Sequence, residues 1–120
     1  MNISVNKQFK FEAAHGLPKY DGKCKNVHGH SYVFEISISG PIITEGPKEG
    51  MVIDFGDISK VVDKNIIDKW DHQYLNDVVT FNPTAENLAV EILKITNDSG
   101  LSVNKVKLWE TANSFVEVMR

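Results

Sequence analysis

The stretch HGHSYVFEISIS, residues 28–39, alternates regularly between apolar and polar side chains. A period of two is the pattern of a β-strand with one buried face. Residues 3–11 alternate in the same way, and a polar loop with Pro18 and Gly22 separates the two segments. We therefore expect two strands that pair antiparallel. Their apolar faces comprise Tyr32, Phe34, Ile36 and Ile38 in one strand and Ile3, Val5, Phe9 and Phe11 in the other.

Two later segments have a helical period instead. Asp54 or Asp57 can cap a helix that ends near Asp71, and Thr84 can cap a second helix that ends over residues 97–100. Two further strands are predicted over 103–110 and 115–119. Apolar residues recur about every 3.6 positions in both helices: Ile58, Val61, Val62, Ile66 and Trp70 in the first, and Leu88, Ala89, Ile92 and Leu93 in the second.

The order strand, strand, helix, helix, strand, strand predicts a single α+β domain over residues 1–120. We expect a four-stranded antiparallel sheet with both helices on one face. Water can cover the other, polar face, but the two free edges of such a sheet invite pairing between chains. Oligomerisation into a closed barrel would remove those edges.

Composition excludes several classes of protein. The formal net charge of -3 argues against a nucleic-acid-binding protein. No apolar stretch approaches the roughly 20 residues of a membrane span, and the N-terminus lacks the apolar core of a signal peptide. The single cysteine excludes an internal disulfide and fits a reducing compartment. We therefore expect a cytoplasmic protein that binds neither nucleic acid nor membrane.

Three of the four histidines suggest one metal site. If His28-Gly29-His30 opens a strand, both imidazoles lie on one face. The pair alone is equally compatible with a chance arrangement on the surface. His15 favours a shared site, because it follows the first strand and the paired strand begins at residue 28. Three nitrogen ligands with an open fourth position are typical of catalytic zinc.

Cys24 lies four residues before His28, between Lys23 and Lys25. Positive charge nearby favours the thiolate, the form that acts as a base or nucleophile. Two alternatives remain open: an inert, buried thiol, or a fourth zinc ligand that would make the site structural. The sequence alone does not choose among these three roles.

Asp71-His72 and Glu110 complete the candidate residues. Asp71-His72 at a helix end is usually a polar terminus, but His72 is the one histidine outside the metal set and could handle the proton of a thiol. Glu110 has the parity of Val106 and Leu108 and should point inward, although a glutamate at a strand end is commonly solvated. An inward carboxylate can bind an amidine-like edge, which pterin and guanine rings carry.

Six sequence blocks occur in one order along nearly the whole chain: Phe11-Glu12-Ala13-Ala14-His15; Cys24 with His28-Gly29-His30; Gly50-Met51-Val52-Ile53-Asp54-Phe55; Asp71-His72-Gln73-Tyr74-Leu75-Asn76; Pro83-Thr84-Ala85-Glu86-Asn87; and Glu110-Thr111. With these blocks the chain resembles the 6-pyruvoyltetrahydropterin synthase family. It is most similar to the bacterial branch, the 6-carboxytetrahydropterin synthases of the QueD type. Trp70 departs from the family pattern, which usually has leucine before Asp-His.

The resemblance implies the tunnelling fold (T-fold), in which three subunits join their sheets into a barrel and two trimers stack as a homohexamer. It also implies active sites between subunits, so that one chain does not hold a complete pocket. The implied roles are a zinc ion held by His15, His28 and His30; Cys24 as general base; Asp71 and His72 as proton relay; Glu110 as catalytic residue and pterin anchor; and Thr84 and Glu86 as further substrate-binding residues.

The implied reaction is a carbon–carbon lyase reaction. It converts 7,8-dihydroneopterin triphosphate to 6-carboxy-5,6,7,8-tetrahydropterin, with release of acetaldehyde and triphosphate, in queuosine and deazapurine biosynthesis. The short interval from Cys24 to His28 is that of the bacterial branch. Two alternatives stay open. One is a 6-pyruvoyltetrahydropterin synthase, which only eliminates triphosphate, and the other is a non-catalytic, zinc-stabilised pterin-binding protein.

Overall fold

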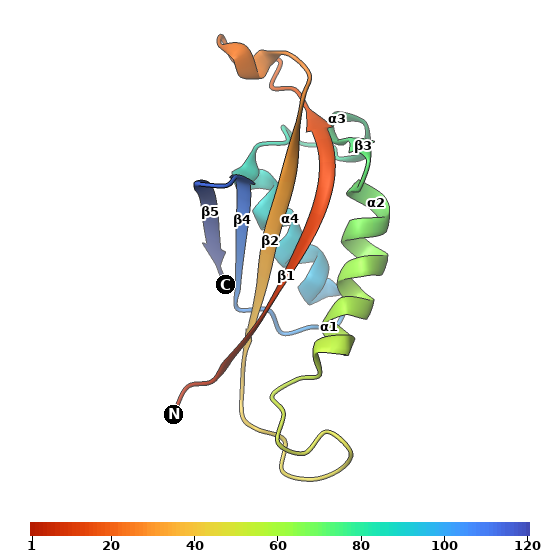
Figure 1. The fold of residues 1–120 in the computed structure, drawn as a ribbon, viewed down its shortest axis with the longest axis vertical. Coiled ribbons are helices and arrows are strands. Elements are labelled where there is room, and N and C mark those ends of the chain that lie inside the picture. The colour runs from red at the N-terminus through yellow and green to blue at the C-terminus, as the bar shows by residue number, and fades with distance from the viewer.

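The computed structural model describes residues 1–120 as one sheet with helices packed on one face (Figure 1). The strand order is β3-β1-β2-β4-β5. The strands are β1 (Ser4–His15), β2 (His28–Ser39), β3 (Gln73–Tyr74), β4 (Lys105–Thr111) and β5 (Ser114–Met119). The helices are α1 (Phe55–Val62), α2 (Asp68–Trp70), α3 (Leu75–Val78) and α4 (Ala85–Asp98). The α+β class is therefore confirmed.

The predicted four-stranded antiparallel sheet is wrong in one respect. The sheet has a fifth strand, β3, which pairs parallel with β1 at Ala13 and Ala14 and makes the sheet mixed. Two residues are too few to produce a recognisable alternation of polar and apolar side chains. The other four strands are antiparallel neighbours, as expected.

The hairpin of β1 and β2 is longer than the sequence pattern predicts. Its register runs from Ser4 opposite Ser39 to His15 opposite His28. Within it Phe11 stacks on Tyr32, with ring centroids 4.8 Å apart. Such an aromatic pair contributes about 0.5–1.5 kcal/mol beyond the area that it buries. The strands therefore stay paired up to the histidines.

The first predicted helix is α1 and α2 joined by a π-helical turn, Asp63–Ile67. Its N-cap is Asp54, whose side chain accepts a hydrogen bond of 2.8 Å from the Gly56 N–H. Thr84 caps α4, as predicted. Trp70, at the end of α2, is buried and meets the edge of the Phe11 ring at 5.7 Å. The replacement of leucine by tryptophan is thus a packing change.

The core lies between the helices and one face of the sheet. It contains 20 buried apolar residues, drawn mainly from β1, β2, β4 and both long helical segments, with Leu75, Leu101 and Val103 outside these elements. Residues of opposite parity in the strands, such as Glu12 and Ser31, are exposed. None of the helices combines the length and hydropathy that crossing a bilayer requires.

Candidate metal and active site

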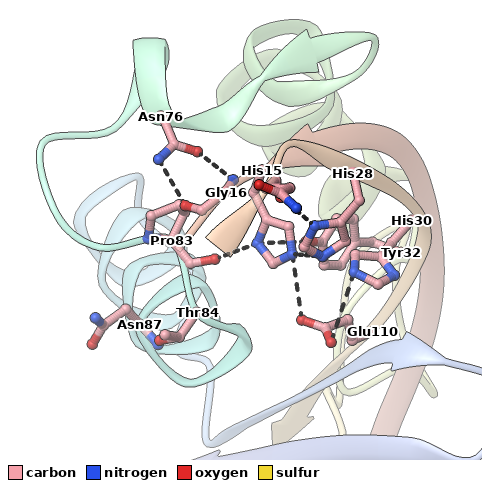
Figure 2. Close-up of polar contacts among 11 residues, drawn as sticks. His15, Gly16, His28, His30, Tyr32, Asn76, Pro83, Thr84, Asn87 and Glu110 are labelled. Atoms are coloured by element: carbon pink, nitrogen blue, oxygen red, sulfur yellow. Dashed lines mark hydrogen bonds and ion pairs between the residues drawn. The ribbon is translucent and has the colours of Figure 1, made fainter. Parts of the chain in front are cut away.

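Three histidines continue the core-facing rows of β1 and β2 at the loop end of the hairpin. His15 lies directly opposite His28, and His30 lies opposite Ala13. Because side chains alternate between faces, all three imidazoles project from the same face as Phe11 and Tyr32. One ligand nitrogen from each lies within 4.8 Å of the others. The three imidazoles therefore form a group that could hold a metal ion (Figure 2).

Two backbone carbonyls decide the tautomers of His15 and His28. Nδ1 of His15 lies 2.7 Å from the Pro83 carbonyl oxygen, and Nδ1 of His28 lies 2.7 Å from that of Asn26. A carbonyl oxygen only accepts, so each Nδ1 carries the hydrogen and each Nε2 of the neutral rings has a lone pair. The two Nε2 atoms are 3.0 Å apart. Two facing lone pairs repel each other unless a proton or a cation lies between them.

His30 supplies the third donor. Its Nε2 is the one buried side-chain nitrogen or oxygen in the structure that has no hydrogen-bond partner. Burial lowers the pKa of His30; Glu110 opposes this effect, and the neighbouring His15 and His28 add to it. His30 is therefore neutral near pH 7, which is the form that binds metal. Three imidazole nitrogens suit zinc, so these residues fit the ion that the sequence predicts.

Glu110 points toward the histidines, as its parity predicts. Its two carboxylate oxygens lie 3.8 Å from Nε2 of His15 and 3.8 Å from Nε2 of His30. The side chain is 30% exposed and lines two hollows. One hollow, of about 670 Å³, also includes His30 and Trp109. Glu110 can therefore contact both the three histidines and a molecule bound in the hollow beside them.

Tyr32 is a site residue that the sequence identifies only as part of the core. Its side chain is fully buried, and its hydroxyl lies 3.3 Å from Nδ1 of His15. Burial raises the pKa of Tyr32, and the negative charge of Glu110 raises it further. Tyr32 therefore stays a neutral phenol below the histidines.

Asp71 and His72 lie at the edge of the sheet beside β1. Oδ1 of Asp71 accepts a 2.8 Å hydrogen bond from the Glu12 N–H, and Oδ2 lies 3.0 Å from Nδ1 of His72. The Glu12 N–H is the main reason that the pKa of Asp71 is lowered, and the bond to His72 adds to it. His72 has a left-handed backbone (φ 60°), which is uncommon for a residue other than glycine. Its N–H donates to the Glu12 carbonyl at 2.6 Å.

His72 is turned outward, with 78% of its side chain exposed. It lines a hollow of about 520 Å³ together with His30. Cys24 is half-buried in one turn of 3-10 helix, Lys23–Lys25, and lies outside the group of histidine donors. No hydrogen bond or ion pair joins Cys24 to His72. Within a single chain, the three histidines and Glu110 lie together. Cys24, the predicted base, does not contact Asp71 and His72, the predicted relay.

Thr84 and Glu86 border a third hollow, of about 410 Å³, that also includes Glu110 and Phe115. The Thr84 hydroxyl is occupied as the cap of α4, since it accepts a 3.1 Å hydrogen bond from the Asn87 N–H. Glu86 is exposed in the first turn of that helix. Both residues therefore border the same hollow as Glu110, and their role in substrate binding stays a prediction.

Comparison with known proteins identifies the family. Residues 4–120 match the family described as 6-pyruvoyl tetrahydropterin synthase. The chain belongs to this family. A Haemophilus influenzae relative named 6-carboxy-5,6,7,8-tetrahydropterin synthase is 37% identical over 96% of this chain and 97% of its own. A relative of the same name from Synechocystis is 36% identical over 92% of this chain and 88% of its own.

Solved structures of the family have the same fold. The Caenorhabditis elegans 6-pyruvoyl tetrahydropterin synthase superimposes with a TM-score of 0.85 and 27% identity, over 100% of this chain and 96% of that one. A Plasmodium vivax 6-pyruvoyltetrahydropterin synthase, at 19% identity, superimposes with a TM-score of 0.78. The prediction of a T-fold subunit is thereby confirmed.

Proposed function

We propose that this protein is a zinc-dependent 6-carboxytetrahydropterin synthase. It takes 7,8-dihydroneopterin triphosphate and one water to 6-carboxy-5,6,7,8-tetrahydropterin, acetaldehyde and triphosphate, a step toward queuosine and related deazapurines. The observation that carries this proposal is the convergence of His15, His28, His30 and Glu110 at one end of the sheet. The names of the bacterial relatives support the carboxy product.

His15, His28 and His30 would hold the zinc ion. A bound zinc ion lowers the pKa of a hydroxyl that coordinates it, so that the substrate's side-chain hydroxyls lose protons more readily. The Pro83 and Asn26 carbonyls keep two of these imidazoles in the ligating tautomer. Glu110 binds the amidine-like edge of the pterin and orients the side chain toward the histidines.

Cys24 takes the proton from the substrate side chain, and Asp71 with His72 relays it. Nδ1 of His72 donates to Asp71, which leaves Nε2 of the neutral ring free to accept a proton. Because His72 faces outward and lies apart from Cys24 within one chain, the relay acts in a pocket shared with another subunit. Thr84 and Glu86 form part of the substrate-binding wall beside Glu110.

The shared pocket requires an oligomer. The outer edge of β1 is covered only at Ala13 and Ala14, and the outer edge of β5 has no partner. β5 also exposes the apolar side chains of Phe115 and Met119. These features support a trimeric barrel built by edge pairing and a hexamer of two such barrels. Light scattering should give about six times the chain mass of 13.5 kDa, and a monomeric mass would refute this assembly.

A 6-pyruvoyltetrahydropterin synthase is the second candidate, favoured by the close superposition on the Caenorhabditis elegans enzyme of that name. The two reactions share the substrate but differ in whether the carbon chain is cleaved. Incubation with dihydroneopterin triphosphate and identification of both products separates them. Acetaldehyde together with 6-carboxytetrahydropterin supports the proposal. 6-Pyruvoyltetrahydropterin without acetaldehyde contradicts it, and absence of any turnover would favour a zinc-stabilised binding protein.

A further inference from the structure

Asn76 holds the backbone next to a histidine of the metal centre, although it has no part in the proposed reaction. Its Oδ1 accepts a 3.0 Å hydrogen bond from the N–H of Gly16, and its Nδ2 donates a 2.8 Å hydrogen bond to the carbonyl of the same residue (Figure 2). A carboxamide has both a donor and an acceptor, so it satisfies both backbone groups of one residue. Gly16 directly follows His15.

The bonds to Asn76 fix the strand where its backbone pairing ends. β3 pairs with β1 at Ala13 and Ala14, and the pairing of β1 with β2 ends at His15. Beyond that point the Asn76 side chain takes the place of a neighbouring strand. Gly16 itself is buried, and a Cβ atom there would lie 3.3 Å from the Lys25 carbonyl oxygen. The end of β1 is therefore held closely on both sides.

The same segment of chain also holds the His15 ring. The Pro83 carbonyl accepts from Nδ1 of His15 at 2.7 Å. The residues on either side of Pro83 are fixed by Asn87, whose Nδ2 donates to the Asn82 carbonyl at 2.9 Å and whose N–H donates to the Thr84 hydroxyl at 3.1 Å. Two contacts therefore connect His15 to residues 76–87. One is the bonding of Asn76 to the backbone of Gly16, and the other is the bond from the His15 ring to the Pro83 carbonyl.

We propose that Asn76 is a positioning residue for the metal centre. By tying Gly16 to α3, it keeps the Pro83 carbonyl against Nδ1 of His15, which holds His15 in the tautomer whose Nε2 faces His28 and His30. The proposal rests on the proposed function in that zinc is the ion bound there. The tautomer of His15, however, can be measured without any metal.

The test compares Asn76→Ala with a matched control, Asn97→Ala. Asn97 makes the same two kinds of bond near the other end of α4: Nδ2 donates to the Leu93 carbonyl at 2.9 Å, and Oδ1 accepts from the Val103 N–H at 3.0 Å. Two readouts apply to the full chain. Long-range ¹H–¹⁵N NMR of the metal-free protein gives the tautomer of His15, and competition with a chelator gives the affinity for zinc.

We expect Asn76→Ala to convert His15 to a mixture of tautomers and to weaken zinc binding by about 10-fold or more, as for other residues that orient metal ligands. Asn97→Ala should lower the melting temperature but leave both readouts at their wild-type values. The proposal is overturned if Asn76→Ala keeps the Nδ1–H tautomer and binds zinc as Asn97→Ala does.

If Asn76→Ala does not fold, Asn76→Asp provides the test, because it keeps an acceptor for the Gly16 N–H and removes only the donor to the Gly16 carbonyl. A change in tautomer or in zinc affinity then supports the proposal, and wild-type values for both overturn it. Failure of the wild-type protein to bind zinc would contradict the proposed function instead. The tautomer comparison would still decide the role of Asn76.

Discussion

His30→Leu should separate the zinc-binding role of this histidine from any structural role. In the metal-free protein, Nε2 of His30 is buried without a partner, and the side chain is 16% exposed. A buried, unsatisfied polar group costs about 1–3 kcal/mol. Because the His30 side chain is partly exposed, its cost lies at the lower end of this range. Replacement by an apolar side chain of similar size should therefore stabilise the metal-free protein by about 1 kcal/mol.

With zinc bound, the wild type should become more stable than His30→Leu. At a free zinc concentration of about 100 times Kd, a ligand that binds only the folded state stabilises it by about 2.7 kcal/mol. For 120 residues, an unfolding entropy of about 2.1 cal/mol/K per residue converts this to a rise of roughly 10 °C in Tm. On the same basis, the stabilisation of metal-free His30→Leu converts to a rise of about 4 °C in its Tm. Zinc should raise Tm for the wild type but not for His30→Leu.

Thermal unfolding at one protein concentration, with chelator or with buffered zinc, measures both effects. His72→Leu is the matched control, because His72 is 78% exposed and lies outside the histidine group. It should keep the full zinc-dependent rise in Tm. A zinc-dependent rise that persists in His30→Leu would refute its role as a ligand. A metal-free Tm well below that of the wild type would show that His30 is needed for packing.

Three other substitutions test the remaining residues. Cys24→Ala should keep zinc while turnover falls by about 10²–10⁴-fold, the usual loss for a general base; loss of zinc would identify Cys24 as a ligand. Glu110→Gln should weaken pterin binding by roughly 10–100-fold, since a charge-assisted hydrogen bond contributes about 1.5–3 kcal/mol; unchanged affinity in a fluorescence titration would refute the anchoring role. Asp71→Asn tests the pH dependence of stability. The pKa of Asp71 is lowered from 3.8, mainly by the Glu12 N–H, so its stabilisation is full above that pH and is lost as the pH falls through the lowered pKa. The variant should therefore lose less stability on acidification than the wild type, as measured by denaturant unfolding, and an identical loss would argue against this contribution.

The local sequence pattern determines most of the fold and the face on which the site lies. The period of two from Tyr32 to Ile38, extended backward, places His28 and His30 on the core face, and the same parity leads from Phe11 to His15. Caps at Asp54 and Thr84 mark where the helices begin. These features depend on residues close together in the chain, which is why the sequence reveals them.

Only the tertiary structure determines how the histidines of the site are positioned and oriented. The register that sets His15 opposite His28, the Pro83 carbonyl on Nδ1 of His15, and the Asn76 bonds to Gly16 all join segments far apart in sequence. A backbone carbonyl is present at every residue, so no side-chain pattern indicates which one orients a histidine. The left-handed backbone of His72, whose N–H donates to Glu12, and the two-residue strand β3 likewise lie against β1, far away in the sequence. The sequence therefore determines which side chains can bind a metal, and the packing of distant segments determines which of their atoms face it.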